Sequence, residues 1–88
     1  MKLKYNFVSN EVADKIVAVA VGDDLQKFNG FIKMNDTGAY IFNMLKNDVT
    51  EEAIVAAMKK DYSDATEEEI RETVSEFVGK LKDADILE

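Results

Sequence analysis

The change from strand to helix in this chain falls within one stretch, Met34-Asn35-Asp36-Thr37-Gly38-Ala39-Tyr40-Ile41-Phe42-Asn43-Met44-Leu45. The apolar run Phe31–Met34 stops at Asn35, and a helical pattern of apolar residues begins at once. Asn35 is a good N-cap, because its side-chain oxygen can accept a hydrogen bond from a free amide of the first helical turn. The stretch therefore predicts a strand that leads directly into a helix, with no linker between them.

The residues that precede this stretch have the features of short strands. Lys15–Val21 alternates valine with smaller residues, which is typical of a half-buried strand. Phe7-Val8 indicates an earlier strand. Three groups of residues have turn chemistry: Glu11–Asp14, Gly22–Asp24 and Phe28–Gly30. Connections this short predict an antiparallel meander of three strands, the last of which is Phe31–Met34.

Two helices are predicted after the strands. The first begins after Asn35 and ends at Asn47-Asp48. The second begins after Thr50, where Val49 and Ile54 have the spacing of a hydrophobic staple. The period of the apolar residues gives each helix one buried face. The residues expected on these two faces are Thr37, Ile41, Met44, Leu45, Ile54, Ala57, Met58 and Tyr62.

The third predicted helix has the clearest start signal. Thr66–Glu69 is a capping box, and its glutamates suit the positive end of the helix dipole. Its apolar stripe consists of Ile70, Val74, Phe77, Val78 and Leu81. We expect the helix to end near Asp83 and Ile86-Leu87 to fold back as a hydrophobic tail.

The predicted order of elements is β-β-β-α-α-α. A run of strands followed by a run of helices is typical of an α+β fold. Three short helices against a small sheet resemble a winged helix-turn-helix in which the sheet comes first. At 88 residues, the chain is expected to form one domain that spans residues 1–88.

The charge of the chain argues against nucleic-acid and anionic-membrane partners. The net charge is −7, and the whole deficit lies in residues 50–88, which carry five basic and twelve acidic residues. An acidic surface repels phosphates. It favours a basic partner, or it simply keeps a small domain soluble. The longest apolar run, Ile16–Val21, is too short to cross a bilayer, and no signal peptide is visible, so we expect a cytoplasmic location.

No pattern for catalysis or for cofactor binding appears. The chain has no cysteine and no histidine, which excludes disulfides and Cys/His metal sites. Its three serines, Ser9, Ser63 and Ser75, lie in no nucleophile motif and no Asp-Ser carrier motif. The acidic clusters lack the spacing of a calcium loop, and the glycines lack that of a phosphate loop. We therefore expect no enzyme, no cofactor and no metal.

A peptide-binding function remains after these exclusions. Phe31–Met34 ends the meander and is expected to be an edge strand, whose free amides and carbonyls can pair with another chain. Lys33 or a neighbouring helix could instead block this edge. DNA binding is disfavoured, because the third helix carries Glu67, Glu68, Glu69, Glu72 and Glu76 where a recognition helix brings basic residues.

The chain resembles the PqqD family of small proteins that assist peptide modification. The resemblance rests on Asn35–Ala39 after an apolar strand end, on Ile41-Phe42 and on Leu45. It continues through Thr50–Ile54, Phe77-Val78 with Leu81, and the terminal pair Ile86-Leu87. Similar proteins often have Trp in the place of Phe42 and Gly in the place of Asp85. Asp visits left-handed conformations more readily than most residues, so the turn at Asp85 can persist.

The resemblance implies a winged-helix-like domain that binds the leader of a ribosomally made precursor peptide. It implies that the leader joins the edge strand Phe31, Ile32, Lys33 and Met34 in a groove walled by the third helix. We assign that wall, from helical periodicity, to Arg71, Val74, Ser75, Val78 and Lys82. The implied partner is a modifying enzyme, often a radical SAM enzyme. The alternatives are a winged-helix regulator or protein interaction module, acting as a homodimer, and a structural domain without a peptide ligand.

Overall fold

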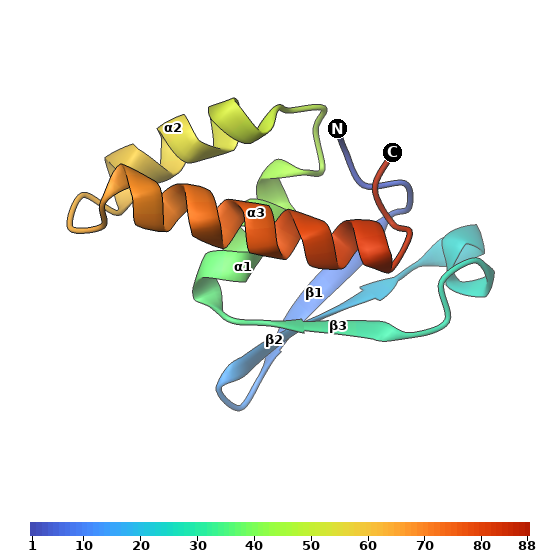
Figure 1. Cartoon of the computed structure of the whole chain (residues 1–88). Coiled ribbons are helices and arrows are strands. Elements are labelled where there is room, and N and C mark those ends of the chain that lie inside the picture. Colours follow the sequence, from blue (N-terminus) through green and yellow to red (C-terminus); the bar gives the residue numbers. More distant parts are fainter.

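The computed structural model describes residues 1–88 and confirms the α+β fold, with a three-stranded antiparallel sheet followed by three α-helices (Figure 1). The elements in chain order are β1 (Phe7–Val12), β2 (Lys15–Ala20), the 3-10 helix η1 (Gly22–Gln26), β3 (Phe31–Met34), α1 (Asp36–Met44), α2 (Glu51–Asp61) and α3 (Glu67–Asp83). None of the helices combines the length and the apolar character that a bilayer crossing requires.

The sheet has the order β1-β2-β3, so β2 is central and β3 is an edge strand. Phe7 pairs with Ala20 in the first ladder, and Met34 pairs with Ile16 in the second. β1 runs to Val12, so the first turn is shorter than the predicted Glu11–Asp14. The two remaining residues make the turn, in which Ala13 takes a left-handed conformation with φ +56°.

The start of α1 confirms the strand-to-helix junction predicted from the sequence. Asn35 has an extended backbone, and its side-chain oxygen accepts a hydrogen bond from the Gly38 amide at 2.8 Å. The backbone therefore leaves β3 at Met34 and enters the helix within two residues. This direct connection fixes the orientation of the edge strand relative to α1.

The predicted caps of the other two helices are confirmed as well. The Thr50 hydroxyl accepts a hydrogen bond from the Ala53 amide at 3.1 Å. The Thr66 hydroxyl accepts one from the Glu69 amide at 3.1 Å and donates to the Glu69 carboxylate at 3.0 Å. Each helix thus starts where local side-chain chemistry satisfies its free amides.

One hydrophobic cluster forms the core, between the inner face of the sheet and the three helices. The inner face of β2 carries Ala18 and Ala20, which are almost fully buried, whereas its valines are half-buried. Small residues on this strand allow α1 to approach the sheet closely. Phe7 packs edge-on against Phe42, with ring centroids 5.3 Å apart.

The buried helix faces differ in part from the predicted ones. Phe42 and Val55 are buried although neither was assigned to a face, and Thr37 and Ala57 are only half-buried. Apolar periodicity identifies a side of a helix about a quarter-turn wide, and the position of the neighbouring elements decides which flanking residue is covered. The predicted core residues Ile41, Leu45, Ile54 and Met58 are buried, as are Ile70, Val74, Val78 and Leu81.

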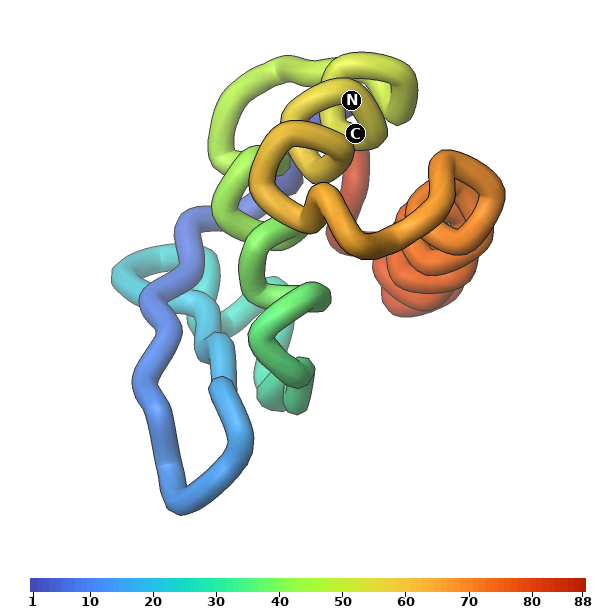
Figure 2. The backbone as a smooth tube through the Cα atoms, turned by 90° about the vertical axis from the view of Figure 1, so that its left-hand side faces the viewer, coloured from blue at the N-terminus to red at the C-terminus, as the bar shows by residue number.

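The carboxy-terminal tail folds back as expected. Asp85 takes a left-handed conformation with φ +59°, and the next two residues, Ile86 and Leu87, are buried. Leu87 forms an isolated antiparallel bridge with Leu3, so the two ends of the chain lie side by side. Figure 2 shows the β1–β2 hairpin extending away from the helices, with α3 to one side of the strands.

Candidate functional site

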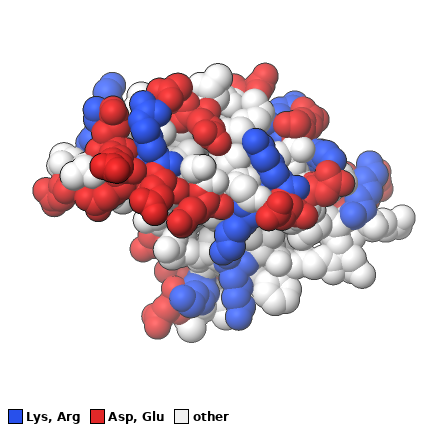
Figure 3. Space-filling model, viewed as in Figure 1, with Lys and Arg blue, Asp and Glu red and all other residues white.

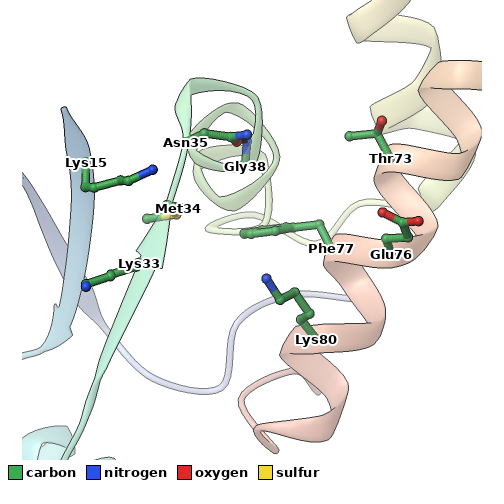
Figure 4. Close-up of a pocket in the computed structure, with 9 residues that line it drawn as sticks. All are labelled: Lys15, Lys33, Met34, Asn35, Gly38, Thr73, Glu76, Phe77 and Lys80. Carbon is green, nitrogen blue, oxygen red and sulfur yellow. Dashed lines mark hydrogen bonds between the residues drawn. The ribbon is translucent and has the colours of Figure 1, made fainter.

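A groove of about 370 Å³ lies between β3 and α3. β2 and β3 contribute Lys15, Lys33 and Met34, and the junction into α1 contributes Asn35 and Gly38. The residues from α3 are Thr73, Glu76, Phe77 and Lys80. In Figure 4, Phe77 and Lys80 reach from α3 toward β3. The groove therefore runs beside the edge strand of the sheet.

β3 has a strand partner on one side only. Its four residues pair with Ile16–Val19 of β2, and no strand lies along its other edge. In an antiparallel strand, alternate residues direct their N–H and C=O groups to opposite edges. Part of the β3 backbone is therefore free to pair with a further extended chain.

The apolar lining of the groove is small and is made by Met34 and Phe77. Met34 is buried, whereas the Phe77 ring is half-buried and extends toward β3 (Figure 4). Gly38 permits this arrangement, because a Cβ atom there would lie 3.0 Å from Phe77 Cε1 and 3.1 Å from Met34 Cβ. The glycine of the Asn35–Ala39 segment thus makes room for the aromatic ring.

The polar lining of the groove is mainly basic. Three lysines and one glutamate line it, and none of the four forms an ion pair. In Figure 3, acidic side chains dominate the left part of the helical layer, and basic side chains run down the middle of the face from α3 toward the sheet. The groove offers an apolar surface with cationic groups around it, and it has no nucleophile paired with a base.

The structure places the four predicted strand residues on β3 in two different settings. Lys33 and Met34 line the groove. Phe31 and Ile32 do not: Phe31 is 60% exposed, and Ile32 is half-buried against the core.

The five predicted residues of α3 do not line this groove. Val74 and Val78 are each 1% exposed and belong to the core. Ser75 and Lys82 are exposed outside the lining. Arg71 contacts α2, where its guanidinium donates two hydrogen bonds to the Glu52 carboxylate. The side of α3 that faces the groove instead carries Thr73, Glu76, Phe77 and Lys80.

The position of Arg71 has a clear electrostatic consequence. Its hydrogen bonds hold the pKa of the Glu52 carboxyl below the ordinary value, and Glu52 in turn raises the pKa of Arg71. On the same side, Lys59 of α2 donates to Glu67 of α3 at 2.9 Å. Arg71 therefore joins α3 to α2 and is not available in the groove.

Sequence signals for the residues that line the groove exist but are weak. Thr73, Glu76, Phe77 and Lys80 are separated by three, one and three positions, so they form one row beside the apolar stripe. Phe77 was predicted as a core residue because it lies seven positions after Ile70 in the apolar stripe, but its ring is half-buried and lines the groove. Periodicity alone does not reveal which flank of the stripe turns toward β3.

The fold and the groove define a class of small α+β domain in which a helix runs beside a free edge strand. The chain belongs to the PqqD family: the family model described as Coenzyme PQQ synthesis protein D (PqqD) matches residues 15–87. No curated protein matched the chain in a sequence comparison.

A solved structure, TbiB1 in complex with the TbiA(beta) leader peptide, has a similar fold. The TM-score is 0.75 at 24% sequence identity, and the alignment covers 100% of this chain and 95% of TbiB1.

Proposed function

We propose that this chain is a non-enzymatic peptide chaperone, which binds the leader of a ribosomally synthesised precursor peptide and presents it to a modifying enzyme. The observation that carries the proposal is the groove between the free edge of β3 and the Phe77 side of α3. Membership of the PqqD family and the similar fold of leader-bound TbiB1 support the same function.

In the proposed binding mode, the leader adds as a further strand to β3. Backbone hydrogen bonds supply affinity in strand addition, and side-chain pockets supply selectivity. Met34 and Phe77 would contact one apolar leader side chain. Of the nine residues expected to bind the peptide, Lys33 and Met34 keep a direct role in this mode, while Phe31 and Ile32 contribute through the backbone. Thr73, Phe77 and Lys80 replace the five helix residues.

The proposed enzyme partner is a radical SAM enzyme or another enzyme that modifies peptides, in the cytoplasm where the precursor is made. The acidic helical layer offers it a surface that suits basic residues. Such steering predicts that the enzyme complex weakens as salt concentration rises. A complex equally strong in low and high salt would remove electrostatic steering from the proposal.

The alternative of a DNA-binding regulator finds no support in the geometry. The exposed side of α3 carries Glu68, Glu72 and Ser75. The two carboxylates repel the phosphate backbone, which a DNA-binding helix must approach closely. We expect no binding in a titration with duplex DNA.

Proline substitution tests strand addition directly. Of two neighbouring residues in β3, Ile32 and Lys33, one directs its N–H toward β2 and the other toward the free edge. Proline at the outward position removes a donor and leaves the β2 ladder intact. We expect Ile32→Pro or Lys33→Pro, whichever remains folded, to weaken peptide binding at least about tenfold.

The probe is a set of synthetic peptides that covers the short open reading frames next to this gene, with calorimetry as the readout. The matched controls are Asn10→Pro and Glu11→Pro on β1, the opposite edge of the sheet. The folded β1 variant should bind like the parent. Strand addition to β3 would be wrong if every folded proline variant at Ile32 or Lys33 bound the peptide as well as the parent.

A further inference from the structure

The groove beside β3 differs in charge from the rest of the molecule. Its lining has three lysines and one glutamate, so its formal charge is +2 in a chain whose net charge is −7. The excess of positive charge is confined to the groove, because most carboxylates of the chain lie in residues 50–88. A ligand in the groove therefore meets a basic surface, although the protein as a whole is acidic.

The three lysines of the groove have no acidic partner within the protein. Lys15, Lys33 and Lys80 form no ion pair, and Glu76 lies one helical turn from Lys80 without pairing with it. The four cationic side chains that do have a carboxylate within 4.0 Å lie elsewhere: Lys4, Lys27, Lys59 and Arg71. The positive charge of the groove is thus available to a ligand.

The lysines also come from three different elements that surround the groove. Lys15 belongs to β2, Lys33 to β3 and Lys80 to the last turn of α3. Figure 4 shows Lys15 extending toward β3 and Lys80 extending toward the same strand from the opposite side, with the Lys33 ammonium on the β2 side of β3. A chain added to the free edge of β3 would lie between β3 and Lys80, with the ammonium groups of Lys15 and Lys33 across β3 from it.

We propose that this groove selects peptides with an acidic side chain at the position seated between β3 and Lys80, and rejects peptides with a basic residue there. The inference rests on the proposed peptide-binding function. A bound peptide displaces water from Lys80, so binding costs free energy if the peptide leaves the ammonium group without a negative partner. A positively charged peptide side chain at this position raises that cost further. The groove thereby differs from the acidic surface in residues 50–88, which favours basic partners.

A displayed library of random peptides, selected separately on the parent and on two variants, tests this inference. Lys80→Glu reverses one charge of the groove. Lys60→Glu is the matched control, because Lys60 lies in the last turn of α2, is exposed and forms no ion pair. Both substitutions make the same change at the negative end of a helix dipole. Circular dichroism confirms that each variant is folded.

We expect the peptides selected on the parent and on Lys60→Glu to be enriched in Asp and Glu, and those selected on Lys80→Glu to lose this enrichment. Peptides selected on the parent without an acidic preference would overturn the inference and leave the peptide-binding function in place. An equal loss with Lys60→Glu would overturn it too, because the effect would then come from net charge. If no peptide is selected on the folded parent, the proposed function itself fails, and the inference fails with it.

A charge exchange with one selected peptide locates the contact. Replacing its acidic residue by Lys should weaken binding to the parent about tenfold, and the Lys80→Glu variant should recover most of that loss. Calorimetry gives both affinities. A peptide that loses affinity equally for the parent and for Lys80→Glu would show that its acidic residue does not contact this lysine, and the assignment to Lys80 would be wrong.

Discussion

Gly38 has two structural roles, because it takes part in the start of α1 and it leaves space for the side chains that line the groove. It is the third residue of α1, and its amide donates to the Asn35 cap. Its missing side chain leaves the space that Phe77 and Met34 occupy. The resemblance to a family drew attention to this glycine, and the structure gives it a physical role in shaping the groove.

Substitution of Gly38 by alanine should therefore be destabilising. The new Cβ atom would lie 3.1 Å from Met34 Cβ, which is held by the backbone of β3 and cannot move aside alone. Overpacking of this kind costs about 1–3 kcal/mol, against a gain of at most about 1 kcal/mol in helix propensity. Urea denaturation measures the change in the free energy of unfolding.

Gly79 supplies the matched control for that substitution. It lies within α3, and a Cβ atom there would meet nothing within 4 Å. Gly79→Ala should stabilise the protein by about 1 kcal/mol, because only helix propensity changes. If Gly38→Ala stabilised the protein as much as Gly79→Ala, the close approach to Met34 and Phe77 would not affect the free energy of unfolding.

Asp85 shows a backbone feature that the sequence did predict. The residue takes the left-handed conformation expected of a glycine at a helix end. The Asp85 amide donates to the Lys82 carbonyl at 3.0 Å, and the Ile86 amide donates to the Leu81 carbonyl at 3.2 Å. This is a Schellman motif, which turns the chain so that Ile86 enters the core.

Among the secondary-structure elements, the helix starts were predictable because they depend on local chemistry. The end of α1 was not: the helix ends at Met44, before the predicted Asn47-Asp48. The bounds of β3 and the caps Asn35, Thr50 and Thr66 follow from neighbours within four residues. The groove side of α3 could not be predicted in the same way. It depends on the rotation of α3 relative to β3, which is set by core contacts between distant segments.

Between α2 and α3, ion pairs predict a pH dependence of stability. Arg71 lowers the pKa of Glu52 below its ordinary 4.5, and hydrogen bonding by Lys59 does the same for Glu67. A carboxyl whose pKa is lower in the folded state stabilises the fold above its unfolded pKa, and this contribution is lost as pH falls through the lowered value. We therefore expect the melting temperature to fall as pH decreases below about 4.5.

The Glu52→Gln variant tests the contribution of that pair. Above the ordinary carboxyl pKa it should melt at a lower temperature than the parent, and the difference should shrink in acid, where the parent also loses the charge. Glu72→Gln is the control, because Glu72 is exposed and forms no ion pair. A constant difference between Glu52→Gln and the parent at every pH would exclude an ionic origin.

On the scale of the whole molecule, a small core depends on both ends of the chain. Ile86 is fully buried, and its carbonyl accepts a hydrogen bond from the Lys4 amide at 2.8 Å. The tail thus closes the core from the side of the amino terminus. The sequence predicted that the tail would fold back, but its pairing with Leu3 is a contact between the two ends that no local pattern indicates.

Truncation of the buried Ile86 side chain should remove a large part of the free energy of unfolding. Ile86→Ala removes core methyl groups at a fully buried site, for which the expected loss is about 2–5 kcal/mol. Val12→Ala is the control, because Val12 is 59% exposed, and we expect a change within about 0.5 kcal/mol. Chemical denaturation of both variants gives the comparison, and equal losses would contradict the role assigned to the tail.

The pairing of the two ends has a consequence for protein engineering. Because the Glu88 amide donates to the Lys2 carbonyl at 2.8 Å, both ends of the domain leave the fold at one place. Domains with adjacent ends tolerate insertion into a surface loop of a host protein. No residue before Lys15 or after Lys80 lines the groove, so an inserted copy would keep it open to solvent. Inserted into a host protein, the domain would then report peptide binding through a change in the activity of the host.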